Sequence, residues 1–119
     1  MADLYVHRDR LEIHLTSAEK ALALRRSDVV IPREHIHSAA ITEDPWIWIR
    51  GIRSPGSVIP LVLSVGTWKF HGGKDFLLVK GKNRPAVVID LKGSEFSRVI
   101  VSTPQAATLI AALRSEASD

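Results

Sequence analysis

Residues 102–113 read STPQAATLIAAL, the pattern of a capped amphipathic helix that follows a strand-rich chain. Thr103 can accept a hydrogen bond from the free amide groups of a first helical turn, and Pro104 suits the first helical position. Four apolar residues then recur at helical spacing and mark one face: Ala106, Leu109, Ile110 and Leu113. We expect a helix over residues 103–116. Because so short a helix is marginal alone in water, it must lay that face on an apolar body.

The chain before this helix has the pattern of short strands joined by tight turns. Alternation predicts a hairpin of residues 4–7 and 10–15, with Arg8 and Asp9 in its turn. A second hairpin is predicted around Gly72 and Gly73, which can adopt the backbone angles of a two-residue turn. Further strands are expected at 29–31, 36–42, 46–50, 86–91 and 98–102. A helix near 17–25 and an ordered loop over 51–60, rich in proline and glycine, complete the prediction.

These elements predict one mainly β domain over residues 1–119, which is α+β when its elements are counted. We expect a strongly bent antiparallel sheet or small barrel of about seven to eight strands, plugged by the terminal helix. A chain with 45% hydrophobic and 24% charged residues is suited to one compact core.

Composition excludes several classes of protein and site. The chain has no cysteine, so disulfides and thiolate metal sites are excluded, and we expect a cytoplasmic protein. Its longest uncharged stretch, residues 54–68, is broken by proline and glycine and predicts no transmembrane segment. The formal net charge is +3, but acidic residues are interspersed among the basic ones. We therefore expect no nucleic-acid partner.

The middle of the chain carries a family resemblance. The residues concerned are Gly51-Ile52-Arg53-Ser54-Pro55-Gly56, Pro60, Gly66-Thr67-Trp68 and Gly73-Lys74-Asp75-Phe76. With the strand-rich body and the terminal helix, this block resembles the pleckstrin-homology-like (PH-like) superfold, and in particular a group of small bacterial proteins of that fold. The resemblance implies a PH-like fold and leaves the ligand open, since that group has no assigned activity.

No catalytic or metal motif stands out in the chain. His35 and His37 would share one face of a strand and could reach one metal ion, but no third ligand stands at a suggestive spacing, and two solvated histidines explain the pair as well. No Gly-x-Ser-x-Gly sequence occurs, and Glu43 and Asp44 would point to opposite sides of an extended chain. We therefore predict neither an enzyme, nor a cofactor, nor a metal site.

Residues 46–50, Trp-Ile-Trp-Ile-Arg, are the main candidate binding surface. In a strand, Trp46, Trp48 and Arg50 would share one face, either exposed as a binding surface or packed in the core. Arg53, Lys69 and Lys74 could add a basic rim for a carboxylate, a phosphate or an acidic peptide. Alternatively, Arg53 ties together the carbonyl groups of its own loop.

From these features we predict a non-enzymatic binding or assembly module. It would recognise a protein partner, or form a homo-oligomer, through the candidate surface. Binding to anionic lipid at a membrane surface is the alternative, since exposed Trp beside Arg also suits that role. A small enzyme with an unrecognised site is a third hypothesis.

Overall fold

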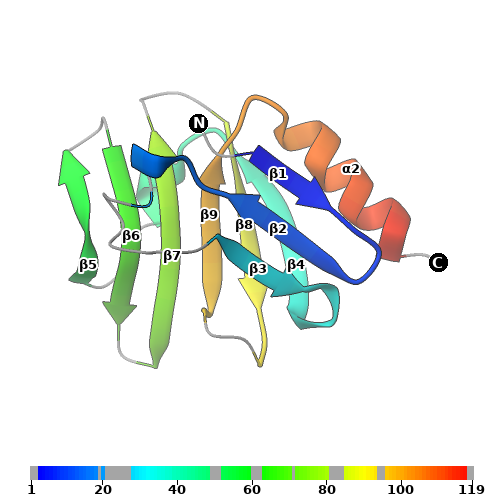
Figure 1. The fold of residues 1–119 in the computed structure, drawn as a ribbon, viewed down its shortest axis with the longest axis horizontal. Helices are drawn as coiled ribbons and strands as arrows, with labels where there is room; N and C mark the ends of the chain where they lie inside the picture. The colour runs from blue at the N-terminus through cyan, green and yellow to red at the C-terminus, as the bar shows by residue number, and fades with distance from the viewer. Residues whose placement is uncertain are drawn as a thin grey trace.

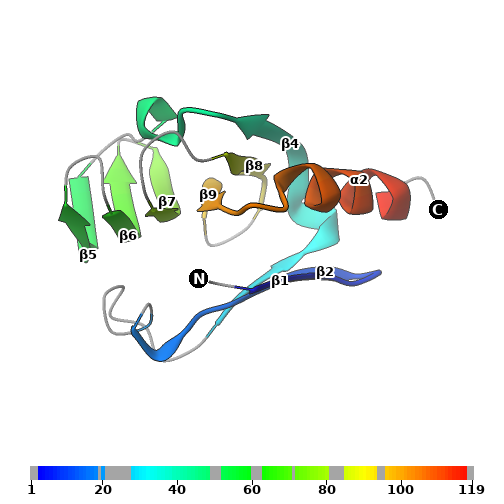
Figure 2. The same cartoon turned by 90° about the horizontal axis from the view of Figure 1, so that it is seen from above.

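The computed structural model describes residues 3–18, 20, 28–48, 52–59, 63–70, 72–80, 85–93 and 96–117. Its strands form two sheets, drawn in Figure 1, which Figure 2 shows as two layers. The prediction of a mainly β fold is therefore confirmed. Within the described residues the strands number nine, and they form two separate sheets where the sequence predicted one bent sheet or barrel of seven to eight strands.

The small sheet contains β1 (Asp3–Val6), β2 (Arg10–His14) and β3 (Val29–Pro32), in that order. Both of its ladders are antiparallel. Leu11 and Ile13 of β2 are buried, and the polar residues that alternate with them, Arg10, Glu12 and His14, lie toward the other face. The predicted hairpin is therefore confirmed. The backbone amide of His7 closes the turn by donating to the carbonyl of Arg10 at 2.8 Å.

The large sheet contains six strands, in the order β4-β8-β9-β7-β6-β5. Their bounds are Ile36–Thr42 (β4), Ile52–Ile59 (β5), Leu63–Phe70 (β6), Gly73–Lys80 (β7), Ala86–Leu91 (β8) and Arg98–Ser102 (β9). The second predicted hairpin is confirmed as β6 and β7, in which Phe70 pairs with Gly73. Gly72, in their turn, has a φ of +107°, which glycine adopts readily because it has no Cβ.

The prediction that all strands run antiparallel is wrong for β7 and β9, which are parallel. After β7 the chain skips the position beside β7 and forms β8 one position farther along the sheet. β9 then turns back, antiparallel to β8, and fills the position left between them. Turn signals in the sequence indicate where a chain reverses, but they do not say which position in the sheet the next strand takes.

Two local predictions in the middle of the chain are also wrong. The predicted loop 51–60 contains the edge strand β5, whose pairing with β6 shifts register between Arg53 and Gly56. An edge strand with such a bulge tolerates Pro55, since not every amide of an edge strand is needed for pairing. The predicted strand 46–50 instead begins within the 3-10 helix η2 (Pro45–Trp48). Proline suits the first position of a helix because its φ is already helical.

The main core lies between the two sheets and includes the C-terminal helix α2 (Ala106–Ala117). The predicted apolar face of this helix is buried at all four positions, which are Ala106, Leu109, Ile110 and Leu113. Helix α2 lies between β4, at one edge of the large sheet, and β1, at one edge of the small sheet (Figure 2). It therefore closes one open side of a two-layer sandwich instead of plugging a barrel.

The start of α2 differs slightly from the prediction. The hydroxyl of Thr103 accepts a hydrogen bond from the amide of Gln105 at 3.2 Å, within a turn that precedes the helix. The amide of Leu109 then donates to the carbonyl of Gln105 at 2.9 Å. The helix accordingly begins at Ala106 and not at Thr103.

The predicted helix near 17–25 falls mostly outside the described residues, of which Ser17, Ala18 and Lys20 are helical. The described helices include none with the length and hydropathy needed to cross a bilayer.

Candidate functional site

The two tryptophans of the predicted binding surface face the large sheet. Both are half-buried and pack on an apolar cluster that lies on the face turned away from the small sheet: Trp68, Leu77, Val79, Ala86, Val88 and Ile100. The indole N–H of Trp48 donates to the hydroxyl of Thr42 at 3.1 Å. Ile47, between the tryptophans, is 73% exposed instead. Of the two alternatives for Trp46 and Trp48, an exposed surface or packing in the core, the structure therefore favours packing.

The predicted basic rim is divided between the two faces of the large sheet. Lys69 and Lys74 are cross-strand partners and lie on the face that carries Phe76 and meets the small sheet. Arg53 is in register with Trp68, which belongs to the opposite face. The side chain of Arg53 and the whole of Arg50 lie outside the described part of the chain. The lysines therefore do not join the tryptophans in one surface.

A row of polar and charged residues across the large sheet was missed by the sequence analysis. Its members are in register on successive strands: Ser38, Asp90, Arg98 and Asp75. The next residue in register, on β6, is Trp68 of the apolar cluster. The Nε of Arg98 donates to Asp90 at 2.7 Å, and its guanidinium carbon lies 5.2 Å from the centroid of the Trp48 ring. The row thus links β8 to β9 beneath Trp48. We attribute a structural role to it because Arg98 is already paired with Asp90 and covered by an indole.

A second polar network covers the outward face of the small sheet, with Glu12 at its centre. One carboxylate oxygen lies 2.7 Å from Nε2 of His14, and the other accepts a hydrogen bond from Arg10 Nε at 2.6 Å. These two hydrogen bonds lower the pKa of Glu12 from its ordinary value of 4.5 to about 2. The His14 ring also lies 4.6 Å from the ring of Tyr5, centroid to centroid. The network therefore connects β2 with β1 and keeps Glu12 ionised at acidic pH values at which an ordinary glutamate would be protonated.

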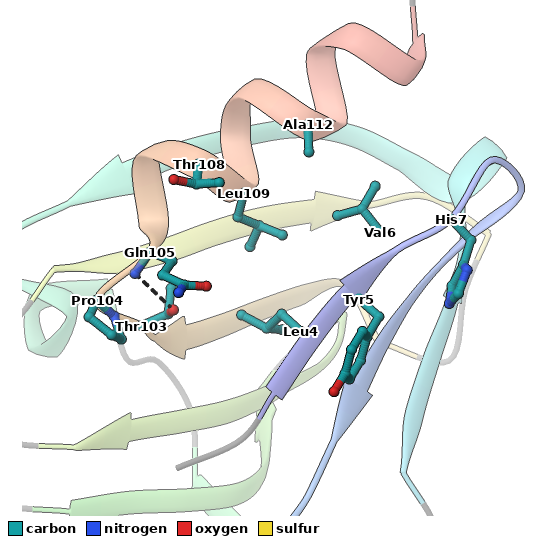
Figure 3. Close-up of a pocket in the computed structure, with 10 residues that line it drawn as sticks. All are labelled: Leu4, Tyr5, Val6, His7, Thr103, Pro104, Gln105, Thr108, Leu109 and Ala112. Atoms are coloured by element: carbon teal, nitrogen blue, oxygen red, sulfur yellow. Dashed lines mark hydrogen bonds between the residues drawn. The ribbon is translucent and has the colours of Figure 1, made fainter.

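A groove of about 600 Å³ runs between β1 and α2. Its lining comprises Leu4, Tyr5, Val6, His7, Thr103, Pro104, Gln105, Thr108, Leu109 and Ala112. Figure 3 shows that Leu4 and Val6 of β1 and Leu109 and Ala112 of α2 point into the space between the two elements. Tyr5 and His7 point to the other side of β1 (Figure 3). The result is an apolar groove with polar groups of Thr103 and Gln105 at one end, which we call the β1–α2 groove.

The backbone of β1 adds hydrogen-bonding groups to this groove. Among the described strands, β1 pairs with β2 alone and therefore forms an edge of the small sheet. In an antiparallel ladder, pairs that exchange hydrogen bonds alternate with pairs that do not. His7 donates to the carbonyl of Arg10 across the turn, so these two residues form a pair of the bonded kind. The next bonded pair along the ladder is Tyr5 with Glu12. The amides and carbonyls of Leu4 and Val6 therefore point away from β2, and no hydrogen bond from any described residue satisfies them.

Arg33 holds the other end of the groove together. Its Nη2 donates to the carbonyl of Leu113 in α2 at 2.6 Å, and its Nη1 donates to the carbonyl of His7 at 3.2 Å. Its backbone amide also donates to the carbonyl of Asp9 in the β1–β2 turn at 2.9 Å. One arginine thus connects α2 to the end of β1. No local sequence pattern indicates this contact, since Arg33 and Leu113 are 80 residues apart.

The two histidines considered as metal ligands lie in different elements. His35 is the last residue of the 3-10 helix η1 (Arg33–His35), whereas His37 is exposed on β4. The described residues contain no group of three or more His, Cys, Asp or Glu side chains placed to hold a metal ion.

Comparison of the chain with protein-family models, with curated proteins and with solved structures returned no match. Its function is therefore inferred from the β1–α2 groove and its surroundings alone.

Proposed function

We propose that this protein is a non-enzymatic binding module that recognises a segment of a protein partner in the β1–α2 groove. The observation that carries the proposal is an apolar groove, one wall of which carries backbone groups of Leu4 and Val6 that no described residue satisfies. Such groups are costly to bury without partners and are available to a ligand that offers complementary ones.

The size and lining of the groove support binding of a short segment. Its volume of about 600 Å³ lies within the range of known ligand sites. Leu109 and Ala112 supply an apolar wall, and the edge of β1 supplies donors and acceptors. Because few residues take part and association itself is costly, we expect a Kd on the order of 10 to 100 µM.

A binding role is favoured over a catalytic one by the arrangement of the polar residues in the lining. His7 is the one imidazole in the part of the lining that the structure describes, and its Nε2 lies 3.4 Å from Glu12, on the outward side of β1. Thr103 uses its hydroxyl in the turn before α2. No nucleophile in the described lining stands beside a base, as covalent catalysis requires.

The anionic-lipid alternative predicted from Trp46, Trp48 and the basic residues receives less support. Both indoles are half-buried against the large sheet, and Lys69 and Lys74 lie on its other face. The PH-like resemblance stays a prediction. We also propose a cytoplasmic location, in keeping with a chain that has no cysteine.

The test of this function is to fill the groove. Ala112→Trp places an indole between α2 and β1, whereas the matched Ala111→Trp places the same side chain on the exposed side of the same helix. Linear peptides are selected on the wild-type protein from a displayed random library, and their affinities are measured by fluorescence anisotropy. We expect Ala112→Trp to abolish binding and Ala111→Trp to preserve it.

Two outcomes would overturn the proposed function. One is a library that yields no peptide sensitive to Ala112→Trp. The other is flotation of the wild-type protein with vesicles of phosphatidylserine and phosphatidylcholine at low salt, together with loss of flotation in Trp48→Ala, which would favour the lipid alternative.

A further inference from the structure

We infer that the occupant of the β1–α2 groove is a single extended segment of the partner, which pairs with β1 as a fourth strand of the small sheet. This inference rests on the proposed function and adds the mode of binding and the chemistry of the ligand. Addition of a strand to a sheet edge is a recurring mode of peptide recognition, in which the main chain supplies affinity and alternate side chains supply specificity.

The hydrogen-bonding groups of β1 are arranged for such a strand. Leu4 and Val6 present two amides and two carbonyls on the side away from β2. Residues two apart on a strand are separated by about 6.8 Å, which is also the repeat with which an extended peptide presents its own groups. A segment of about four residues could therefore satisfy all of them.

The position of α2 supports binding of a single added strand next to β1. Figure 1 shows α2 running alongside β1 on the side away from β2, and Figure 2 shows it displaced from the small sheet toward the large one. A strand added beside β1 would continue the small sheet and lie against α2. Its residues facing α2 would contact Leu109 and Ala112, whereas the alternate residues would lie beside Tyr5 and His7.

This geometry defines the chemistry of the ligand. The residues that face α2 must be apolar, because Leu4, Val6, Leu109 and Ala112 surround them. The alternate residues face solvent beside an aromatic ring and an imidazole, so polar and aromatic side chains both suit them. The expected ligand is a segment without proline in which apolar residues alternate with polar or aromatic ones.

A second copy of this chain is a poorer occupant. β1 has four residues and offers an edge of roughly 13 Å. Pairing along so short an edge buries only a small part of the about 800 Å² per partner that a stable interface buries. In a second copy, β2, the core and α2 accompany β1. Pairing of the two β1 strands would bring these elements into the space beside β1 of the first copy, where the α2 helix of that copy already lies. An isolated segment has nothing behind it and avoids this conflict.

The other sheet edges among the described strands carry protective features that β1 lacks. β3 ends at Pro32, and β5 contains Pro55 and a register shift. β4 has a register shift after Ile36. Prolines, bulges and covering elements are the usual means by which proteins block unwanted strand pairing. β1, whose sequence after Asp3 is Leu-Tyr-Val, has neither proline nor bulge.

The test is an N-methyl scan of a selected peptide that binds the wild-type protein and is sensitive to Ala112→Trp. Methylation removes one amide donor at a time and introduces bulk at that position. Strand pairing predicts that affinity falls at least about tenfold at every second position within the paired segment and stays within about twofold between them. The fold of the protein is unaffected, because only the peptide changes.

Each other outcome has a distinct meaning. A scan with no period of two, in a peptide that still requires an open groove, overturns strand pairing and leaves the proposed function standing. The absence of any peptide sensitive to Ala112→Trp overturns both. Light scattering that shows a dimer, converted to a monomer by Ala112→Trp, would identify a second copy as the occupant and contradict the inference.

Discussion

Replacement of Arg33 by methionine is expected to loosen α2 from β1. Methionine keeps a long apolar stem but cannot donate to the carbonyls of Leu113 and His7, which accept from Arg33 at 2.6 and 3.2 Å. A hydrogen bond with a charged partner contributes about 1.5–3 kcal/mol. Because Arg33 is only partly buried and one bond is long, we expect the two bonds together to contribute about 1.5–3 kcal/mol.

The assay is urea unfolding followed by far-UV circular dichroism. The slope m should not change, since the same surface is exposed on unfolding. With m of about 1.5 kcal/mol per M for a chain of this size, the midpoint of Arg33→Met should fall by roughly 1–2 M. Arg33→Lys should give an intermediate midpoint, because its single amino group cannot replace the fork of a guanidinium.

The control is Arg8→Met, at an exposed position of the β1–β2 turn, which should change the free energy of unfolding by no more than about 0.5 kcal/mol. A change of less than about 0.5 kcal/mol in Arg33→Met itself would refute the reasoning. It would mean that water satisfies both carbonyls as well as Arg33 does.

Two further predictions concern the small sheet and the helix. The pKa of Glu12 is lowered from 4.5 to about 2, so its contribution to stability is complete above pH 4.5 and lost as the pH falls toward 2. Urea midpoints measured from pH 7 to pH 2 should therefore fall more steeply for the wild type than for Glu12→Gln, and parallel curves would contradict this. Ile110→Ala, at a position that is 6% exposed, should destabilise the protein by about 2–5 kcal/mol. Ala107→Ser, on the exposed side of α2, should stay within about 0.5 kcal/mol, and equal effects would contradict the assigned face.

Features that depend on neighbours in the sequence could be predicted. The buried positions Leu11 and Ile13 alternate within one strand, and the apolar face of α2 repeats with the period of a helix. The hairpin around Gly72 follows from a residue that can adopt a positive φ. Each of these signals lies within a few residues, where local sterics and the burial of one face determine the outcome.

Local signals failed where the surrounding sheet changed their meaning. The proline and glycine residues of 51–60 predicted a loop, but an edge strand with a bulge accommodates them in β5. The alternation of Trp46–Trp48 predicted a strand, but Pro45 starts a 3-10 helix that turns both indoles toward the sheet. Lys69 and Lys74 lie on the other face of the sheet from these indoles.

The candidate groove could not be predicted because it joins the two ends of the chain. Leu4 and Ala112 come together only when α2 packs between the edges of the two sheets. The parallel pairing of β7 with β9 and the contact of Arg33 with Leu113 are long-range in the same way. No periodicity in one segment contains information about which edge another segment will cover.

The most direct measurement is amide hydrogen exchange of residues 3–7, recorded by NMR with and without a selected peptide. In the free protein the amides of Leu4 and Val6 should exchange quickly, whereas the amide of Tyr5, which lies on the β2 side of the ladder, should be protected. The peptide should slow exchange at Leu4 and Val6 and leave Tyr5 little changed. Unchanged exchange at Leu4 and Val6 under saturating peptide would contradict strand pairing at this edge.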